Sequence, residues 1–360
     1  MGRKDGVTKV DLALQGGGAH GAFTWGVLDR LLEEERIEIE GISGTSAGAM
    51  NAVALVQGLA DGGPPAAQEL LAAYWNRVSD AARFSPIQRT VFDVMMGRWS
   101  LDLSPSFILS QQLSRTFSPY ELNPLGLNPL RDIVAEVFDF AVVNEAKSPK
   151  LFLSATNVRT GLPKVFRQPE ISVDTVMASA CLPFLFHAVE IDGEAYWDGG
   201  YMGNPPLFPL IDETGARDIV VIQINPFTRS EIPRTAYEIE NRLNEITFNA
   251  SLMKELRAII FLWEIIHHEK LDREAYRDAR IHLIQAEEEM RKLSVSSKLN
   301  AERAFLRHLH DIGYETAARW LEENLENLGA RSTWRPGFVL SESLKPAHLP
   351  EDADRSYEEK

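Results

Sequence analysis

The sequence predicts an α/β protein built on a mainly parallel β-sheet. The apolar run 10–14 has strand character and leads through a glycine-rich loop into a helical pattern over residues 22–32. A second run, residues 37–42, leads through Gly44-Thr45-Ser46-Ala47-Gly48 into a stretch of small, helix-permissive residues. A third run, residues 218–224, has the strongest strand character in the chain and is expected to be a central strand. Strands that alternate with helices are typical of βαβ units, whose strands lie parallel in one sheet.

Composition and charge restrict the class of protein. The chain has 360 residues, of which 44% are apolar and 25% charged, as in soluble globular proteins. Its formal net charge of −15 argues against binding to nucleic acid and against electrostatic capture by anionic membranes, but not against docking on lipid through apolar surface. Cys181 is the only cysteine, so no intrachain disulfide framework exists. Because Cys181 lies between Ala180 and Leu182, we interpret it as a core residue rather than a reactive thiol.

The start of the chain carries no targeting signal that we recognise. It lacks the apolar segment of a signal peptide, and Gly6 stands where an N-myristoylation signal has Ser or Thr. No run of about 18 apolar residues predicts a membrane-spanning helix. We therefore expect a cytoplasmic protein; peripheral contact with membranes and secretion by a route without a cleavable signal stay open.

The pentapeptide Gly44–Gly48 has the pattern G-x-S-x-G between a predicted strand and a predicted helix. In that setting the pattern forms a nucleophile elbow, a sharp turn that exposes the serine hydroxyl at the end of the sheet. Its glycines leave room where the chain folds back, and the following helix directs its first amides towards the same point. We therefore predict that Ser46 is a nucleophile, against the alternative that the pentapeptide is only a tight turn.

The glycine-rich loop Gly16-Gly17-Gly18-Ala19-His20-Gly21 allows two interpretations. It fits the G-x-G-x-x-G pattern of dinucleotide-binding folds, with Glu38 or Glu40 as the acidic residue that follows about 20 positions later. Its free amides also suit the oxyanion that forms when a serine attacks an ester. Because this loop and Ser46 follow neighbouring strands of a parallel sheet, we expect them to converge. That convergence favours a hydrolase.

Residues 189–203 predict a hairpin with its turn at Asp192-Gly193, which delivers Asp198 at the end of a strand. An Asp before two glycines is most often only a turn former. A serine nucleophile, however, needs a neighbouring base to accept its proton. Asp198 is therefore our candidate base for Ser46.

Together these motifs resemble the patatin-like phospholipase family of the bacterial type. The resemblance spans roughly residues 8–225. It rests on the ordered set Gly16–Gly21, Gly44–Gly48 and Asp198-Gly199-Gly200, with Asn204 and Pro206 close behind and Ala178-Ser179-Ala180-Cys181-Leu182-Pro183 ahead. It implies a three-layer α/β/α sandwich and a Ser–Asp dyad that hydrolyses acyl esters of lipids without a cofactor.

The resemblance also implies roles for particular residues. Ser46 matches the family nucleophile and Asp198 its base. For the oxyanion and the substrate we expect backbone groups of both loops: Gly16, Gly17, Gly18, Ala19 and Ala47. The family usually carries Arg or Lys at the position of His20, so this chain has no fixed cation there. We expect His20 to make a local hydrogen bond rather than to transfer a proton.

The remaining elements follow from apolar periodicity and turn residues. Before the predicted hairpin the pattern indicates a loop at 61–65, a helix at 66–78, an irregular stretch at 83–129, a helix at 130–138, a strand at 150–155, a turn at 157–163 and a helix at 173–180. After residue 224 it indicates a helical region at 234–270, an edge strand at 279–284 and, at 300–325, one helix or two with a turn near 312–313.

We expect residues 1–335 to form a single domain, since no linker or repeat divides them. Its core motifs lie within residues 8–225, a helical extension covers residues 234–330, and the polar, acidic tail 336–360 is expected to be poorly ordered. The stretch 83–129, rich in proline and aromatic residues, forms either short helices packed over the core or a mobile apolar cap that accepts an acyl chain or touches lipid.

Several alternatives to a Ser–Asp hydrolase stay open. The order Ser46, Asp198, His282 also suits a Ser-His-Asp triad. Three further hypotheses are a nucleotide-binding oxidoreductase that uses the loop at Gly16, a catalytically silent lipid-binding protein and an acyltransferase. A metal site has little support, because His267 and His268 are adjacent rather than one helical turn apart. The sequence does not define the lipid head group, the chain length or the oligomeric state.

Overall fold

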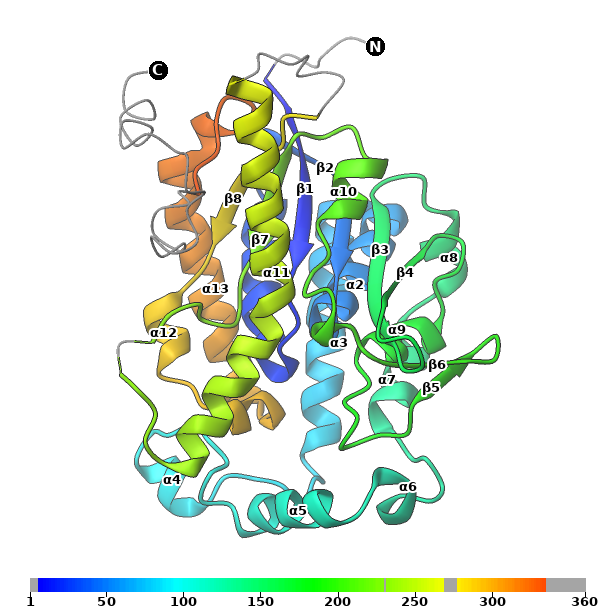
Figure 1. Ribbon diagram of the computed structural model, residues 1–360, viewed down its shortest axis with the longest axis vertical. Helices are drawn as coiled ribbons and strands as arrows, with labels where there is room; N and C mark the ends of the chain where they lie inside the picture. Colours follow the sequence, from blue (N-terminus) through cyan, green and yellow to red (C-terminus); the bar gives the residue numbers. More distant parts are fainter. Residues whose placement is uncertain (1–5, 230, 269–276, 335–360) are drawn as a thin grey trace.

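The strands in the described part of the chain form one eight-stranded mixed sheet in the order β5-β6-β3-β2-β1-β7-β8, with β4 beside β3 (Figure 1). The computed structural model describes residues 6–229, 231–268 and 277–334. The strands are β1 (Thr8–Leu14), β2 (Ile37–Gly44), β3 (Lys150–Asn157), β4 (Pro163–Arg167), β5 (Val189–Ile191), β6 (Glu194–Asp198), β7 (Asp218–Ile222) and β8 (Arg280–Ile284). The pairs β3–β2, β2–β1, β1–β7 and β7–β8 are parallel, whereas β4, β5 and β6 pair antiparallel. The mainly parallel sheet is therefore confirmed, with β7 inside it and β8 at its edge.

Helices cover both faces of the sheet. One face carries α1 (Gly21–Leu32), α2 (Ala47–Gly62), α3 (Pro64–Ala82) and α13 (Arg303–Asn324), and the other carries α10 (Phe208–Glu213) and α11 (Ala236–His268) (Figure 1). The division follows from the alternation of side chains along a strand. In β1, Leu12 and Leu14 are buried in the hydrophobic core under the first group of helices, while Ala13 between them is buried in the core under α10 and α11. The three-layer α/β/α sandwich is therefore confirmed.

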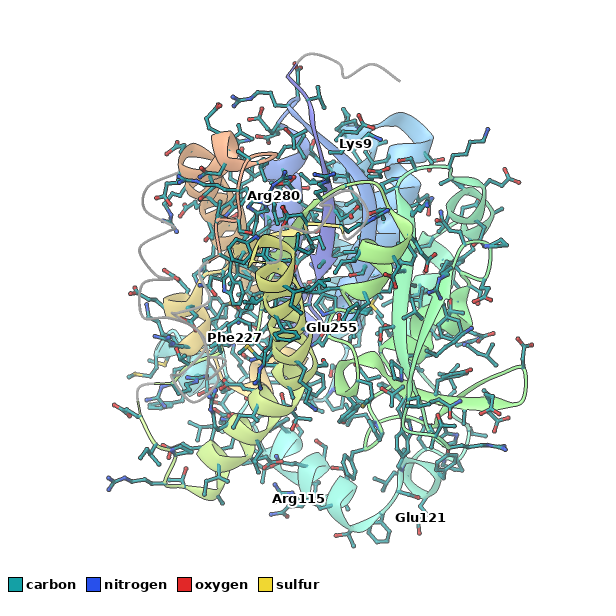
Figure 2. All side chains as sticks on the ribbon, turned by 45° about the horizontal axis from the view of Figure 1, so that its top comes forward. Lys9, Arg115, Glu121, Phe227, Glu255 and Arg280 are labelled. Atoms are coloured by element: carbon teal, nitrogen blue, oxygen red, sulfur yellow. The ribbon has the colours of Figure 1, made fainter. Side chains whose placement is uncertain are left out.

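The remaining short helices lie beyond the sheet or at its antiparallel edge. They are α4 (Val91–Met95), α5 (Pro105–Thr116), α6 (Pro119–Leu122), α7 (Pro129–Val137), α8 (Phe140–Glu145), α9 (Val173–Ser179) and α12 (Glu287–Arg291), with 3₁₀ turns η1 (Gly18–His20), η2 (Gly199–Tyr201), η3 (Val295–Leu299) and η4 (Leu325–Asn327). Helices α4, α5 and α6 lie at the end of the molecule towards which the parallel strands point (Figure 1). Figure 2 shows Arg115 of α5 and Glu121 of α6 at this end and Lys9, near the start of β1, at the other.

The prediction of a loop at residues 61–65 was wrong. Helix α2 continues to Gly62 and α3 begins at Pro64, so Gly63 alone separates them. Gly63 has a φ of 78° and a ψ of −159°, a backbone conformation that is open almost only to glycine and that ends the helix. Pro64 fits the first position of the next helix because that position needs no amide donor. Residues that read as a loop therefore serve as a helix end and a helix start.

Helix α13 is continuous, so the alternative of two helices with a turn near Gly313 does not apply. The glycine serves close packing instead, because a Cβ on Gly313 would lie 2.0 Å from the carbonyl oxygen of Phe23 in α1. The sequence also gave no sign of β4, which begins at Pro163 and extends the sheet beside β3. The end of the long helical region predicted at 234–270 and the tail 336–360 lie outside the described residues.

Within the described part of the chain, no helix combines the length and the apolar character that crossing a bilayer requires.

Candidate active site

The glycine-rich loop and the G-x-S-x-G turn lie against each other. Leu14 at the end of β1 is in register with Gly44 at the end of β2, so the chain leaves both strands at the same level. A Cβ on Gly16 would lie 2.7 Å from the carbonyl oxygen of Thr45 and 2.9 Å from Cβ of Ser46. Only glycine fits at position 16, and the loop therefore runs directly past the serine.

Ser46 has the strained backbone that the nucleophile-elbow prediction requires. Its φ of 56° and ψ of −122° lie in a region that residues with a side chain rarely adopt. Its amide donates a 2.9 Å hydrogen bond to Oγ of Ser179, and α2 begins at the next residue, Ala47. The predicted strand–turn–helix setting is confirmed, and Ser46 is 9% exposed at the end of the sheet.

Asp198 lies at the end of β6, where the predicted hairpin of β5 and β6 turns through Asp192 and Gly193, both with positive φ. Its Oδ1 accepts a 2.7 Å hydrogen bond from the amide of Gly200. Its Oδ2 is buried and has no hydrogen-bond partner within the described residues. A carboxylate with one free, desolvated oxygen is equipped to accept a proton.

Burial raises the pKa of Asp198 to about 7. The amide of Gly200 and then the hydroxyl of Ser46 act in the opposite direction. The Ser46 hydroxyl therefore lies close enough to stabilise the Asp198 carboxylate, although the pair does not meet the geometry of a full hydrogen bond. Asp198 changes its protonation state near neutral pH beside Ser46.

The amides of the two loops divide into bound and free groups. The amide of Gly16 donates to Oδ1 of Asn204 at 2.7 Å, so it is not a free donor. The amides of Gly17, Gly18 and Ala47 donate to no residue that the structure describes. Free amides at two adjoining turns form the kind of site that binds an anion or an oxyanion. Ala19, also predicted here, lies buried in η1.

A buried amide network that the sequence analysis missed holds the glycine loop. Oε1 of Gln15 accepts hydrogen bonds from the amides of Ile224 (2.8 Å) and Asn225 (2.7 Å), and Nδ2 of Asn225 donates to the carbonyl of Gly16 (3.0 Å). Nε2 of Gln15 donates to Oδ1 of Asn249 at 2.8 Å. A usable signal existed, because Asn225 closely follows the apolar strand β7, and polar residues beyond the carboxyl ends of parallel strands commonly line sites.

His20 makes the local hydrogen bond that we expected. Its Nε2 lies 2.7 Å from Oγ of Ser297, and the ring is 4% exposed. Burial holds the pKa of His20 well below its usual value, and the charge of Lys298 lowers it further. His20 is therefore a neutral imidazole and supplies no charge to the loop.

The alternative base His282 is not part of this cluster. It lies in β8 opposite Val220, in the middle of the strand, with Nε2 at 2.9 Å from Oδ1 of Asp218 and Nδ1 at 3.0 Å from Oγ1 of Thr333. Both ring nitrogens are thus engaged away from Ser46. The geometry does not support a Ser-His-Asp triad.

The acidic residues proposed for a dinucleotide site are also misplaced. Glu38 and Glu40 lie in the first half of β2 and form ion pairs with Lys9, whereas the glycine loop follows the opposite end of β1. Cys181 is buried, its Sγ donates to the carbonyl of His187 at 3.0 Å, and burial raises its pKa to about 12. It is a protonated core thiol, as predicted from its neighbours.

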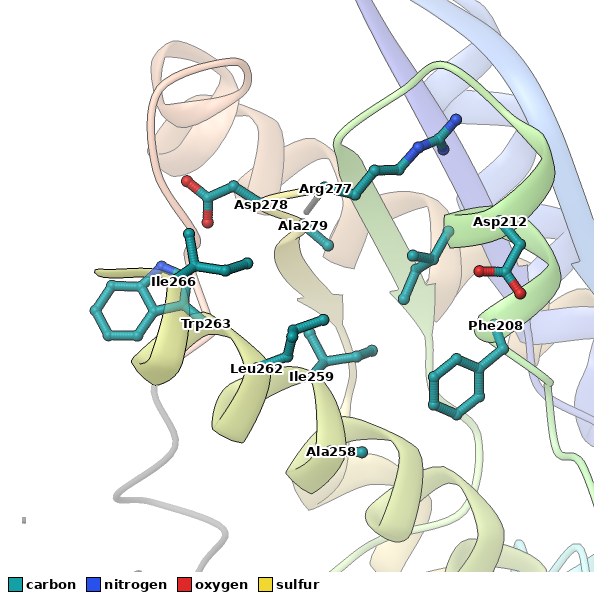
Figure 3. A pocket seen from close by; sticks show the side chains of 11 residues that line it. Phe208, Asp212, Ala258, Ile259, Leu262, Trp263, Ile266, Arg277, Asp278 and Ala279 are labelled. Atoms are coloured by element: carbon teal, nitrogen blue, oxygen red, sulfur yellow. The ribbon is translucent and has the colours of Figure 1, made fainter. Parts of the chain in front are cut away.

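A small apolar cavity of about 120 Å³ lies elsewhere, between α10 and the carboxyl-terminal half of α11 (Figure 3). Phe208, Ile259 and Leu262 contribute to its lining, and none of the predicted site residues does. Within residues 6–229, 231–268 and 277–334, no group of three or more His, Cys, Asp or Glu side chains is arranged to hold a metal ion.

Comparison with known proteins gives a family match. The model of the patatin-like phospholipase family matches residues 12–211, more than half of the chain. Among curated proteins, none matches. Two solved structures resemble the protein over 87% and 89% of its length: VipD from Legionella pneumophila (14% identity, TM-score 0.38) and the heterodimeric ExoU–SpcU complex of the Pseudomonas aeruginosa type III secretion system (16%, 0.38). The match covers 66% and 52% of those chains. The chain belongs to the patatin-like phospholipase family.

Proposed function

We propose that the protein is a serine lipid acyl hydrolase, of the phospholipase A or carboxylesterase type, that acts through a Ser46–Asp198 dyad. The observation that carries the proposal is the pairing of a strained, buried serine with a carboxylate whose Oδ2 has no partner among the described residues. The loop at Gly16 passes against the same serine and places free amides beside it. These groups are what acyl transfer requires: a nucleophile, a base and oxyanion donors.

In the acylation step, Oδ2 of Asp198 accepts the proton of the Ser46 hydroxyl as Oγ attacks the ester carbonyl carbon. The amides of Gly17, Gly18 and Ala47 stabilise the negative charge that develops on the carbonyl oxygen. When the tetrahedral intermediate collapses, the bond to the alcohol breaks and Asp198 returns its proton to the leaving oxygen. The products of this step are the free alcohol and an acyl-serine.

In the deacylation step, Asp198 accepts a proton from water, and the hydroxide attacks the acyl-serine carbonyl at the same oxyanion site. Collapse releases the carboxylic acid and restores Ser46 with the proton from Asp198. An alcohol in place of water converts the same site into an acyltransferase, so the two activities share every group named here. The experiment below therefore measures both products.

Exposed apolar side chains at the site end of the molecule support a lipid substrate. Residues 84–127, which include α4, α5 and α6, contain many apolar side chains that are more than half exposed. They are Phe84, Val91, Phe92, Val94, Met95, Met96, Leu109, Tyr120, Leu125 and Leu127. This apolar surface lies at the end towards which the carboxyl ends of β1 and β2 point (Figure 1). Exposed patches of this kind are typical of lipid or protein contact, and we propose that this one contacts the lipid that carries the scissile ester.

The test is covalent labelling with a fluorophosphonate probe, followed by intact-mass measurement and peptide mapping. We expect one probe per molecule on Ser46 of the wild type, none in Ser46→Ala and strongly reduced labelling in Asp198→Asn. Ser43→Ala is the matched control, because Ser43 is buried in β2 three residues earlier and its hydroxyl has no partner within the described residues. It should label like the wild type.

The same proteins are then given a phospholipid panel with and without an acceptor alcohol. Fatty acid release that is lost in Ser46→Ala supports hydrolysis, and acyl transfer to the alcohol with no fatty acid release supports the acyltransferase. A well-folded wild type that takes up no probe and still binds lipid vesicles would replace the proposal with a silent lipid-binding protein. Full esterase activity in Ser46→Ala would end the dyad mechanism.

A further inference from the structure

Lys298 is a charged residue at the candidate site that the mechanism above does not use. It belongs to η3, outside the segment matched by the family model. Its Nζ donates to Oδ1 of Asn225 (2.8 Å) and to Oδ1 of Asn244 (2.9 Å), and it lies 5.4 Å from the ring centroid of Phe248. Among the described residues, no carboxylate lies within ion-pair distance of it. A desolvated ammonium held by neutral groups alone is costly and requires a reason.

Asn225 connects this ammonium to the glycine loop. Its Oδ1 accepts from Lys298 while its Nδ2 donates to the carbonyl of Gly16 at 3.0 Å. The C=O of Gly16 and the N–H of Gly17 belong to one planar trans peptide and point in opposite directions. Fixing the carbonyl therefore also fixes the direction of the Gly17 amide, which is a proposed oxyanion donor.

The backbone beside Lys298 also contacts the loop. A Cβ on Gly18 would lie 2.5 Å from the carbonyl oxygen of Lys298, and Gly18 has a φ of 59°. Ser297 Oγ donates to the carbonyl of Ser294 at 2.7 Å, so it accepts its second hydrogen bond from Nε2 of His20. Residues 297 and 298 thus contact the loop at both ends of η1, and the positive charge at this contact comes from Lys298 rather than from the imidazole.

We propose that Lys298 is a positioning residue of this hydrolase: through Asn225 it orients the Gly16–Gly17 peptide for the oxyanion, and it supplies the positive charge of the loop. The inference rests on the proposed function. It assigns a role in the reaction to the carboxyl-terminal part of the chain, more than 80 residues beyond the end of the family match at residue 211.

The charges around Lys298 determine how its role depends on pH. It faces Glu245, Asp198 and His20, and Glu245 is itself bound by Arg229 and Arg242. Burial lowers the pKa of Lys298 to about 8, against the raising effect of Glu245 and then of Asp198. The wild type should therefore lose the charge, and with it activity, as the pH rises through about 8.

Asp198 determines where activity is lost on the acidic side of the pH–activity profile, its acidic limb. Its pKa of about 7 is raised by burial and lowered in part by Lys298, and the neighbouring Tyr201 and Cys181 stay neutral because burial raises the pKa of each to about 12. Removing the ammonium removes a positive charge that favours the ionised Asp198 carboxylate. The acidic limb should then move to higher pH.

The experiment compares Lys298→Met, Lys298→Arg and the control Lys292→Met, an exposed lysine six residues earlier. The readouts are kcat/KM for a short-chain p-nitrophenyl ester from pH 5 to 10 and the rate of fluorophosphonate labelling of Ser46. We expect Lys298→Met to lose roughly 10- to 100-fold in kcat/KM at pH 7.5, less than removal of an oxyanion donor itself, and to shift the acidic limb upwards. Lys298→Arg should keep the activity and lose the alkaline limb, because arginine stays protonated.

The outcomes separate the two proposals. If Ser46 is labelled in the wild type while Lys298→Met keeps both limbs and the kcat/KM of Lys292→Met, the role of Lys298 is overturned and the hydrolase stands. The role is overturned too if Lys298→Met loses activity equally at every pH. Should Lys298→Met not fold, Lys298→Arg decides alone: an alkaline limb that persists near pH 8 overturns the inference. An unlabelled wild type overturns the hydrolase, and the inference with it.

Discussion

The amide of Ser46 donates a 2.9 Å hydrogen bond to the hydroxyl oxygen of Ser179, the last residue of α9. The two residues are 133 positions apart in the chain, and the side chain of Ser179 is completely buried. This contact satisfies the amide of a residue whose φ of 56° is strained, and it keeps that amide from donating to the proposed oxyanion. Helix α9 therefore supports the elbow from outside the β2–α2 unit.

Replacing Ser179 by Ala should destabilise the elbow. The buried amide of Ser46 would lose its partner, which typically costs about 1–3 kcal/mol, and we expect labelling of Ser46 to slow by about 10-fold as the strained turn relaxes. Chemical denaturation and the labelling rate measure the two effects. Ser114→Ala is the control, since among the described residues that hydroxyl bonds only to the carbonyl of Gln111 within α5. Unchanged labelling and stability in Ser179→Ala would show that this hydrogen bond does not stabilise the turn at Ser46.

The raised pKa of Asp198 predicts a trade of stability for activity. Because burial raises its pKa from 3.8 to about 7, the folded protein binds this proton more tightly than the unfolded chain. Its contribution to stability is then fully present below about pH 4 and is lost as the pH rises through about 7. Asp198→Asn removes this dependence and should be more stable than the wild type at pH 8, by up to roughly 4 kcal/mol, while its activity is lost.

Asp11 provides the control for that comparison. It is buried in β1, burial likewise raises its pKa to about 7, and its Oδ2 accepts a 2.5 Å hydrogen bond from Thr214. Asp11→Asn should change the pH dependence of unfolding in the same direction but keep the labelling of Ser46. Denaturation curves at pH 5 and pH 8 measure this, and equal loss of activity in both variants would argue against a special role of Asp198.

His282 should matter for stability and not for catalysis. Both of its ring nitrogens are bonded, to Asp218 and Thr333, in a fully buried position. His282→Gln leaves Asp218 with an incomplete set of partners, and we expect a loss of roughly 2–4 kcal/mol in the free energy of unfolding. The labelling rate of Ser46 per folded molecule should stay within twofold of the wild type. A stable variant that fails to label would reinstate the triad.

The sequence predicts the parts of the site that are local in the chain. The strand–turn–helix around Ser46 and the loop at Gly16 follow from short spacings, and the parallel order of β1 and β2 brings them together. Asn225 and Lys298 contact that loop from 209 and about 280 residues away in the chain. Contacts this distant in sequence cannot be predicted from the spacing of residues in a motif. Lys298 in particular lies in a serine-rich stretch that reads as an ordinary polar turn.

The errors in the fold have a similar cause. Residues 61–65 contain two glycines and two prolines, which fit a loop and fit equally a helix end followed at once by a new helix start. Only the packing of α2 against α3 decides between them. Gly313 resembles a turn by its residue type, yet the approach of α1 to α13 requires it. In both places a tertiary contact, which the sequence does not display, selects among locally equivalent conformations.

The apolar surface formed by residues 84–127 predicts a separation between soluble and aggregated substrates. Leu125, which is 80% exposed, lies after α6. Phe261, which is 48% exposed, lies in the carboxyl-terminal part of α11. Leu125→Glu should reduce binding to neutral phosphatidylcholine vesicles, and activity on them, by about 10-fold. The reason is that a charge takes the place of an apolar side chain that the lipid would bury. The kcat/KM for a short-chain soluble ester should stay unchanged. Phe261→Glu, the control, should alter neither. Vesicle co-sedimentation and fatty acid release measure both effects, and equal losses on soluble and vesicle substrates would show that residues 84–127 shape the site itself rather than its contact with lipid.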